Sequence, residues 1–275
     1  MTAAVPGLVD AVSVGPFRVS DLPSEAIAAQ VVQGAAAARL RGRCWVTFAL
    51  HVGGLNSRRD ARYVAAMRSA DLVYADGMSV VMLARLAGAR SIERSGTTDL
   101  GWTVLRALND ALGRPARVAL VGGPPGLTER AGQVLEREAG VDVVFTDHGY
   151  HDDWDESLAA LRGLDCDVLV VGLGAPFEMV WVEEHRAALP ACAVMTCGGW
   201  FGFITQAERR APMWAQRAGL EWAFRLMQSP GRLWRRYAVG VVSTAVLAAR
   251  ITQHSRRQAD VQVSRQRPGS VAQKS

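Results

Sequence analysis

Six short apolar segments, each followed by a stretch with helical spacing, set the strongest limit on how this chain can fold. Several of them are apolar at every position and not only at every second one, as expected for strands covered on both faces. Strands that alternate with helices predict an α/β layered fold with a mostly parallel sheet and helices on both faces. The predicted strands are residues 44–50, 71–76, 117–123, 142–147, 167–174 and 191–199.

Ligands bind such sheets at the carboxyl ends of the strands, so the residues at those ends are the first candidates for chemistry. Asp76 ends the second predicted strand and is followed by Gly77. Its carboxylate could cap the next helix. It could instead act as a general base that takes a proton from an attacking hydroxyl. The position alone leaves both interpretations open.

A glycine-rich loop follows the third predicted strand. Gly122, Gly123 and Gly126 lie just before a predicted helix, whose first amides could bind phosphate. They do not form the G-x-G-x-x-G pattern of dinucleotide-binding proteins, and the lysine of a P-loop is missing. A tight turn without a ligand explains them equally well.

Possible metal ligands are dense in residues 148–156, but this segment reads as a loop leading into a capped helix. We therefore expect a mechanism without a metal or cofactor. The cysteines Cys44, Cys166, Cys192 and Cys197 have neither zinc-site spacing nor the density of a disulfide scaffold. Together with an amino terminus that lacks the pattern of an export signal, they predict reduced thiols and a cytoplasmic protein.

Charge is divided unevenly along the chain. Residues 209–275 contain 13 basic and two acidic side chains, whereas residues 1–208 contain 18 basic and 24 acidic ones. An acidic body argues against a protein that coats nucleic acid with its whole surface. The basic carboxyl-terminal part instead favours attraction of one end to an anionic partner, such as a phosphorylated lipid or a bilayer surface.

Residues 209–237 combine seven arginines and three tryptophans with a single carboxylate. Arg225, Arg232 and Arg235 are seven and three positions apart, so they fall near one face of a helical hairpin. Guanidinium groups on one face suit phosphate, which they bind through paired hydrogen bonds. A solvated basic helix with ordinary core tryptophans is the alternative.

Two segments follow this basic region. Residues 238–251 are apolar but shorter than the roughly 20 residues that span a bilayer, so we expect them to lie on a membrane or to pack as a helix. Residues 253–275 are rich in Gln, Ser and Arg, which predicts a disordered basic tail.

The motifs in these segments resemble, in the same order, those of the WecG/TagA/CpsF family of bacterial glycosyltransferases. The resemblance covers about residues 45–237, and its last motif is the most specific, with RAP-x-W, G-L-E-W and R-L-x-x-x-P-x-R spacing. The matching segments are VTFALH, SADLVYADGMSVV, ERSGTTDL, VALVGGPPG, DVLVVGLGAPFEMVWV and RRAPMWAQRAGLEWAFRLMQSPGRLWRRY.

The resemblance implies an inverting, metal-independent enzyme that moves a sugar from a UDP-sugar to a polyprenyl-diphosphate-linked saccharide. Such an enzyme would work at the cytoplasmic face of the cell membrane, peripherally attached, in cell-surface polysaccharide or glycopolymer biosynthesis. The resemblance also implies a Rossmann-like core, residues 1–206, and a helical membrane-docking appendage, residues 207–252, that closes over the active site. The sugar stays open among N-acetylmannosamine-type, glucosyl and uronic sugars, and so does the formation of a homo-oligomer.

The same resemblance assigns roles to individual residues. The implied catalytic residues are Asp76, as the base, with Thr47 and Arg94. The implied substrate-binding residues are Glu178 and, for the diphosphate, Arg225, Arg232 and Arg235. To these we add the amides of the glycine turn at residues 122–126, which could stabilise a leaving diphosphate.

Two positions depart from the family pattern. Ala49 stands where an asparagine is usual, and Glu178 stands where a glutamine is usual. A carboxylate cannot donate hydrogen bonds as an amide can, so the contact with the sugar or the acceptor must differ. Both departures favour the main alternative, a non-catalytic nucleotide-sugar-binding or membrane-adaptor protein on the same fold.

Two other functions fit the sequence less well. A nicotinamide-dependent oxidoreductase would need the dinucleotide fingerprint and an acidic residue for the ribose, and both are missing. Nucleic-acid binding stays open for the basic tail alone, where it would depend strongly on salt.

Overall fold

The structure is a computed structural model that describes residues 9–207, 212, 215, 221–228 and 230–266. Its central strands are β3 (Trp45–Leu50), β4 (Leu72–Ala75), β5 (Arg117–Gly122), β6 (Asp142–Asp147), β7 (Val168–Gly172) and β8 (Ala193–Thr196). They form one sheet in the order β4-β3-β8-β7-β5-β6, and every neighbouring pair is parallel. Each strand falls within a predicted segment, so the predicted Rossmann-like α/β fold is confirmed.

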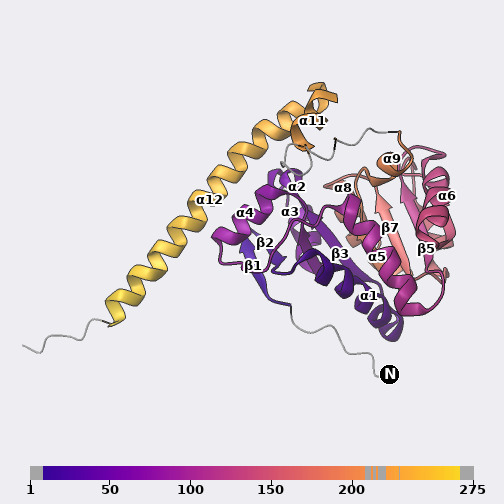
Figure 1. Cartoon of the computed structure of the whole chain (residues 1–275), viewed down its shortest axis with the longest axis horizontal. Helices are drawn as coiled ribbons and strands as arrows, with labels where there is room; N and C mark the ends of the chain where they lie inside the picture. The colour runs from indigo at the N-terminus through magenta and orange to yellow at the C-terminus, as the bar shows by residue number, and fades with distance from the viewer. Residues whose placement is uncertain (1–8, 208–211, 213–214, 216–220, 229, 267–275) are drawn as a thin grey trace, which may run out of the picture.

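Helices cover both faces of this sheet (Figure 1). One face carries α1 (Ser24–Arg41), α5 (Thr97–Leu112), α6 (Leu127–Ala139) and α9 (Trp200–Ile204). The other face carries α3 (Ala61–Ser69), α4 (Met78–Leu86), α7 (Asp155–Arg162) and α8 (Phe177–Glu184), which the short 3-10 helix η1 (Arg186–Ala188) follows. Successive strand residues therefore enter different cores, as Trp45 and Val46 do, which explains why the strands are apolar at every position.

An antiparallel hairpin precedes the sheet, and the sequence patterns did not predict it. Its strands are β1 (Ala11–Val14) and β2 (Phe17–Ser20), joined by a turn in which Gly15 has a φ of 62°. Phe17 is buried and packs edge-on against Tyr63 of α3, with ring centroids 5.7 Å apart. The hairpin therefore extends the core on the α3 side.

The direction of winding reverses between β3 and β8. The chain passes from β3 outward to the edge strand β4, whereas β8 pairs with the other side of β3 after the chain has built the rest of the sheet. A reversal of this kind leaves a crevice at the carboxyl ends of the strands, where ligands of α/β proteins bind.

The carboxyl-terminal helices are α11 (Glu221–Gln228) and α12 (Pro230–Gln266). α12 packs across α4 and the short helix α2 (Val52–Asn56) and then extends away from the body of the molecule (Figure 1). Arg58 donates a 2.7 Å hydrogen bond to the hydroxyl of Ser243, and Leu247 is buried. One side of the apolar segment 238–251 therefore packs on the core, whereas Val239, Val241 and Val242 are more than half exposed. Residues 253–266, for which composition predicts disorder, continue the helix, and residues 267–275 lie outside the described part.

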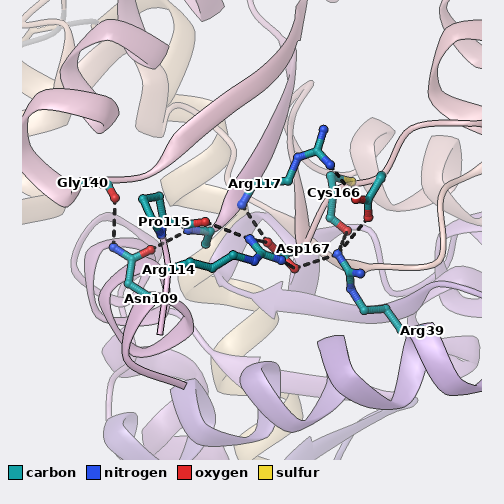
Figure 2. Close-up of polar contacts among 10 residues, drawn as sticks. Arg39, Asn109, Arg114, Pro115, Arg117, Gly140, Cys166 and Asp167 are labelled. Atoms are coloured by element: carbon teal, nitrogen blue, oxygen red, sulfur yellow. Dashed lines mark hydrogen bonds and ion pairs between the residues drawn. The ribbon is translucent and has the colours of Figure 1, made fainter. Parts of the chain in front are cut away.

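A polar network closes the opposite, amino end of the sheet (Figure 2). Its centre is Asp167, whose side chain is only 1% exposed. Arg39 and Arg114 each donate a 2.8 Å hydrogen bond to its carboxylate, and the amide of Arg117 donates another at 2.7 Å. Burial alone would raise the pKa of Asp167, but these hydrogen bonds and the positive charge of Arg39 outweigh it and lower the pKa.

Candidate functional site

A cleft of about 1190 Å³ opens at the carboxyl ends of β3, β4, β7 and β8. It exceeds the roughly 300–1,000 Å³ of common small-molecule sites, so it has room for more than one small substrate. Helix α12 forms one wall, so segments far apart in the sequence meet here. The polar side chains of the lining include Asp76, Arg94, Glu178, Thr196 and Tyr237.

Asp76 directly follows β4 and lines the cleft. Its amide donates to the carbonyl of Leu50 at 2.8 Å, which continues the pairing of β3 and β4 past the last residue of β4. Gly77, not Asp76, holds the N-cap position of α4, with a φ of 123° that side chains rarely adopt. The hydroxyl of Thr97 donates to the Asp76 Oδ2 at 3.2 Å. The carboxylate is therefore held in the cleft by a side chain from α5.

Arg94 reaches the same part of the cleft from the loop before α5. The amide of Ser95 donates to the carbonyl of Ala75 at 2.9 Å, which fixes this loop beside the tip of β4. A Cβ atom added at Gly96 would lie 3.7 Å from Nη1 of Arg94 and 3.8 Å from Oδ1 of Asp76. The guanidinium and the carboxylate therefore approach the same point, and a side chain at residue 96 would crowd both.

Glu178 lies in the first turn of α8 and is 2% exposed. Its Oε2 accepts hydrogen bonds from the amides of Gly174 at 3.0 Å and Gly198 at 3.1 Å, so it ties together the loops after β7 and β8. A glutamine oxygen could accept the same two bonds. The other terminal atom of the side chain is therefore an acceptor oxygen in glutamate, whereas it would be a donor nitrogen in glutamine.

Trp200 and Thr196 form another part of the lining. The Trp200 ring packs against Gly101 of α5, where a Cβ atom would lie 2.4 Å from the ring, so a glycine is required in the middle of this helix. Trp102 contacts the same ring edge-on at 5.9 Å. Thr196 is 1% exposed, and its hydroxyl has no hydrogen-bond partner among the described residues. A buried hydroxyl without a partner beside a cleft is a candidate contact for a ligand.

Cys197 also lines the cleft and is buried. Burial raises the pKa of its thiol well above the usual value, and the negative charge of Glu178 raises it further. The thiol is therefore neutral at physiological pH. Because the thiolate is the nucleophilic form, this cysteine is not suited to covalent catalysis.

The structure does not place Thr47 in the lining of the cleft. Thr47 is fully buried in β3, two residues before Ala49, so both side chains are on the same side of the strand. Ala49 itself lines the cleft. Thr47 thus lies one layer beneath the surface that a ligand would contact, and its Oγ1 has no hydrogen-bond partner within the described part of the chain.

Gly122, Gly123 and Gly126, in the turn after β5, are not among the residues that line this cleft, and their role in binding stays a prediction. A Cβ atom at Gly122 would lie 2.3 Å from the carbonyl oxygen of Gly172, and the amide of Gly123 donates to that oxygen at 3.1 Å. Gly126 precedes α6 in a left-handed conformation. Close approach of β5 to β7 and the start of α6 explain these glycines, and the glycine turns that line the cleft follow β7 and β8.

The predicted diphosphate-binding arginines belong to the carboxyl-terminal helices. Arg225 is in α11, and Arg232 and Arg235 are in α12. The side chains of Arg225 and Arg232 lie outside the described part of the structure, and Arg235 is exposed. Gln228 and Tyr237, from the same two helices, do line the cleft. The helices that carry the arginines therefore reach the site.

The structure brings together Asp147 and two of the possible metal ligands that the sequence analysis found in residues 148–156. Asp147, His148 and His151 each offer a ligand atom, and these atoms lie within 4.8 Å of one another. The two imidazole rings are stacked with centroids 4.0 Å apart and planes 20° apart, so their lone pairs do not converge on one point. The described arrangement is that of a polar loop, which Ser157 supports through a short hydrogen bond to Asp147.

Sequence reasoning missed Thr97, Thr196 and His51, which all contribute to the cleft. The imidazole of His51 accepts the amide of Gly53 at 2.9 Å and caps α2. Thr196 ends β8, but the predicted strand ran on to residue 199, so the prediction did not place Thr196 at a strand end. The role of Thr97 depends on the packing of α5 beside β4, which no local pattern reveals.

In the described ranges, no helix combines the length and the apolar character needed to cross a bilayer.

Comparison with known proteins gives two findings. The sequence profile of the glycosyl transferase WecG/TagA/CpsF family matches residues 12–258 of this chain. A similar protein is the N-acetylglucosaminyldiphosphoundecaprenol N-acetyl-beta-D-mannosaminyltransferase of Bacillus spizizenii, which is 28% identical over 195 residues. The alignment covers 70% of this chain and 75% of that protein.

Proposed function

Because the chain belongs to the WecG/TagA/CpsF family of glycosyl transferases, we propose that it transfers a sugar from a UDP-sugar to a saccharide carried on polyprenyl diphosphate. The transfer inverts the anomeric centre, needs no metal and contributes to a cell-surface glycopolymer. The observation that carries the proposal is the approach of Asp76 and Arg94 to one point in a cleft that α12 borders. A carboxylate and a guanidinium in that arrangement suit a reaction in which a hydroxyl loses a proton and a diphosphate departs.

The Bacillus relative guides the choice of substrates. By its name, that protein uses a lipid-diphosphate N-acetylglucosamine as acceptor and transfers an N-acetylmannosaminyl group. An N-acetylmannosamine-type donor is therefore the first to test here, ahead of glucosyl and uronic sugars. Because Glu178 offers an acceptor atom, we propose that the bound substrate presents a hydroxyl or an amide N–H to it.

Asp76 is the general base of the proposed mechanism. It removes the proton of the acceptor hydroxyl while the hydroxyl oxygen attacks the anomeric carbon from the face opposite to UDP. The bond between that carbon and the diphosphate oxygen breaks, and UDP leaves with the electron pair. Thr47 supports the floor of the cleft beneath Ala49, and Arg94 faces the reacting groups.

The departing diphosphate needs more positive charge than the cleft itself contains. Among the described lining residues, Arg94 carries a permanent positive charge, whereas Asp76 and Glu178 can both be negative. We assign the missing charge to Arg225, Arg232 and Arg235, because α11 and α12 border the cleft. Guanidinium groups bind phosphate oxygens through paired hydrogen bonds and replace a metal ion in this role. Amides of the turns after β7 and β8 add to it.

The same helices are proposed to dock on the cytoplasmic face of the membrane. Trp234 and Val242 of α12 are 56% and 62% exposed, in a region rich in arginine. Tryptophan favours the interface and arginine attracts acidic headgroups. Binding to phosphatidylglycerol vesicles should therefore exceed binding to phosphatidylcholine vesicles and weaken with salt. Trp234→Ser should weaken it, whereas Leu40→Ser, at an exposed position of α1, should not. Equal binding by both variants would count against docking through α12.

Asp76→Asn provides the central test of the activity. A UDP-release assay with a panel of UDP-sugars and synthetic lipid-diphosphate saccharides first identifies the best substrate pair. We expect the variant to lose about 10²- to 10⁴-fold in turnover, the usual contribution of a general base, and to bind the UDP-sugar normally in calorimetry. Near-normal turnover would remove Asp76 from the mechanism.

A matched control is Asp110→Asn, which changes an exposed carboxylate of α5. It should leave turnover unchanged. The configuration of the product, read by NMR, tests inversion, and activity in the presence of a chelator tests independence from metal. If the wild-type protein binds a UDP-sugar but releases no UDP with any lipid acceptor, the non-catalytic alternative replaces the proposed activity.

A further inference from the structure

Two buried hydroxyl groups form a chain of hydrogen bonds that ends at the carboxylate of Asp76. The hydroxyl of Tyr74 lies 2.7 Å from Oγ1 of Thr97, and Oγ1 of Thr97 lies 3.2 Å from Oδ2 of Asp76. Tyr74 is 1% exposed and Thr97 is 5% exposed. Among the described contacts, Oδ2 of Asp76 therefore accepts a hydrogen bond from a buried protein hydroxyl.

The fold explains why these three groups meet. Tyr74 and Asp76 are two positions apart along β4 and its extension, so their side chains point to the same side of the sheet. Thr97 is the first residue of α5, which the bond from the Ser95 amide to the Ala75 carbonyl holds beside the tip of β4. The start of α5 therefore lies directly against the side of β4 that carries both groups.

Counting protons fixes the direction of the chain of hydrogen bonds. An ionised carboxylate only accepts, so Thr97 must use its single hydroxyl proton for Asp76. The same oxygen can then only accept from Tyr74, whose hydroxyl becomes the donor. Burial raises the pKa of Tyr74 well above the usual value, and the charge of Asp76 raises it further. The phenol of Tyr74 therefore stays protonated and can donate a hydrogen bond to Thr97.

We propose that Tyr74 and Thr97 are positioning residues that hold the general base through its Oδ2 and keep it ionised. The proposal rests on the function proposed above. With Oδ2 held from behind, Oδ1 is the oxygen on the side of Gly96 and Arg94, and it is the atom that takes the proton of the acceptor hydroxyl. This chain of hydrogen bonds from Tyr74 through Thr97 to Asp76, called the relay below, transfers no proton. It orients one oxygen and favours the charged form, because a hydrogen bond donated to a carboxylate stabilises its ionised state.

The relay can be removed without a change in side-chain size. Thr97→Val deletes the hydroxyl and keeps the shape, Thr97→Ser keeps the hydroxyl, and Tyr74→Phe deletes only the second donor. We expect Thr97→Val to lower kcat about tenfold and to move the acidic limb of the kcat/KM profile to higher pH. Tyr74→Phe should act in the same direction by less, since Thr97 can still donate. Thr97→Ser should resemble the wild type.

Other charged or titratable groups of the described residues line the same cleft. They are Arg94 before α5, Glu178 of α8, Cys197 after β8, His51 at the start of α2 and Tyr237 of α12. Thr97→Val changes none of them, so a shift of the acidic limb reports on Asp76. Thr103→Val, at an exposed position of α5, is the control for threonine replacement in this helix. Thermal unfolding and UDP binding verify that each variant is folded.

A second readout does not depend on turnover. The ¹³Cγ signal of Asp76, identified by its absence in Asp76→Asn, should titrate at higher pH in Thr97→Val than in the wild type. An unmoved signal in folded Thr97→Val, or a Thr97→Ser protein that behaves like Thr97→Val, would overturn the relay. If Asp76→Asn is active, the proposed mechanism fails instead. If Asp76→Asn is inactive while Thr97→Val titrates normally, the relay alone fails.

Discussion

Two carboxylates at opposite ends of the same sheet have very different surroundings. At the amino end, Asp167 is surrounded by donors from Arg39, Arg114 and Arg117, and its side chain is 1% exposed (Figure 2). At the carboxyl end, Asp76 faces a large cleft and is held from behind by Thr97. The first arrangement stabilises the charged form with fixed partners, and the second leaves room for a ligand.

Buried hydroxyl groups near the carboxyl end reinforce this difference. Two buried hydroxyls near the carboxyl end, those of Ser95 and Thr196, have no hydrogen-bond partner among the described residues, and neither does Thr47 in the middle of β3. A buried polar group without a partner costs on the order of 1–3 kcal/mol. Unsatisfied polar groups beside a cleft are typical of a functional site, where stability is lower so that a ligand can bind.

The largest expected effect on stability comes from the amino end. Asp167→Asn should lower the free energy of unfolding by about 3 kcal/mol, because removing one partner of a buried pair costs roughly 3–5 kcal/mol. The lower end applies because the side chains of Arg39 and Arg114 are each 41% exposed and can be solvated. Urea unfolding measures the change, and UDP release per folded molecule should stay constant.

Asp165→Asn is the matched control, because Asp165 also pairs with Arg39 but is 60% exposed. Exposed ion pairs contribute about 0–1 kcal/mol, so its effect should be small. A loss of turnover in folded Asp167→Asn, or equal destabilisation by both variants, would break the contrast between the two ends of the sheet.

The same network predicts how stability depends on pH. The pKa of Asp167 is lowered in the folded protein, so its contribution is complete above the unfolded-state pKa of about 3.9 and is lost as pH falls through the folded pKa. The difference in unfolding free energy between wild type and Asp167→Asn should therefore be constant from pH 7 to about pH 5 and shrink in more acidic solution. A difference that grows toward low pH would contradict the assigned role of the arginines.

The sequence predicted the strands of the sheet because each is a compact apolar run bounded by turn residues. It also placed Asp76 at a strand end, where α/β proteins bind ligands. It could not predict the order of the strands, which depends on contacts between distant segments. In that order β5, which the glycine turn follows, is one strand farther from β3 and β4 than β7 is. The close approach of Gly122 to Gly172 accounts for one of these glycines by packing between strands, and a role of residues 122–126 in ligand binding stays a prediction.

The amino-end network was equally invisible to local patterns. Arg39 and Asp167 are 128 positions apart, and nothing in either segment indicates the other. The β1–β2 hairpin was missed because its strands have four residues each and lie outside the alternating region. Single positions at strand ends are thus more predictable than partners that come from elsewhere in the chain.

The smallest predicted effect sharpens the comparison at the carboxyl end. Thr196→Val removes a buried hydroxyl that has no partner in the described structure, so the free energy of unfolding should rise by about 1 kcal/mol. Thr47→Val should stabilise the protein similarly, because the Thr47 hydroxyl is also buried and unpaired. Only Thr196 lines the cleft, so Thr196→Val should in addition weaken UDP-sugar binding severalfold in calorimetry. If Thr196→Val instead lowers the free energy of unfolding and leaves UDP-sugar binding unchanged, the Thr196 hydroxyl stabilises the fold and does not contact a ligand. The difference between the two ends of the sheet would then rest on Asp76 and Asp167 alone.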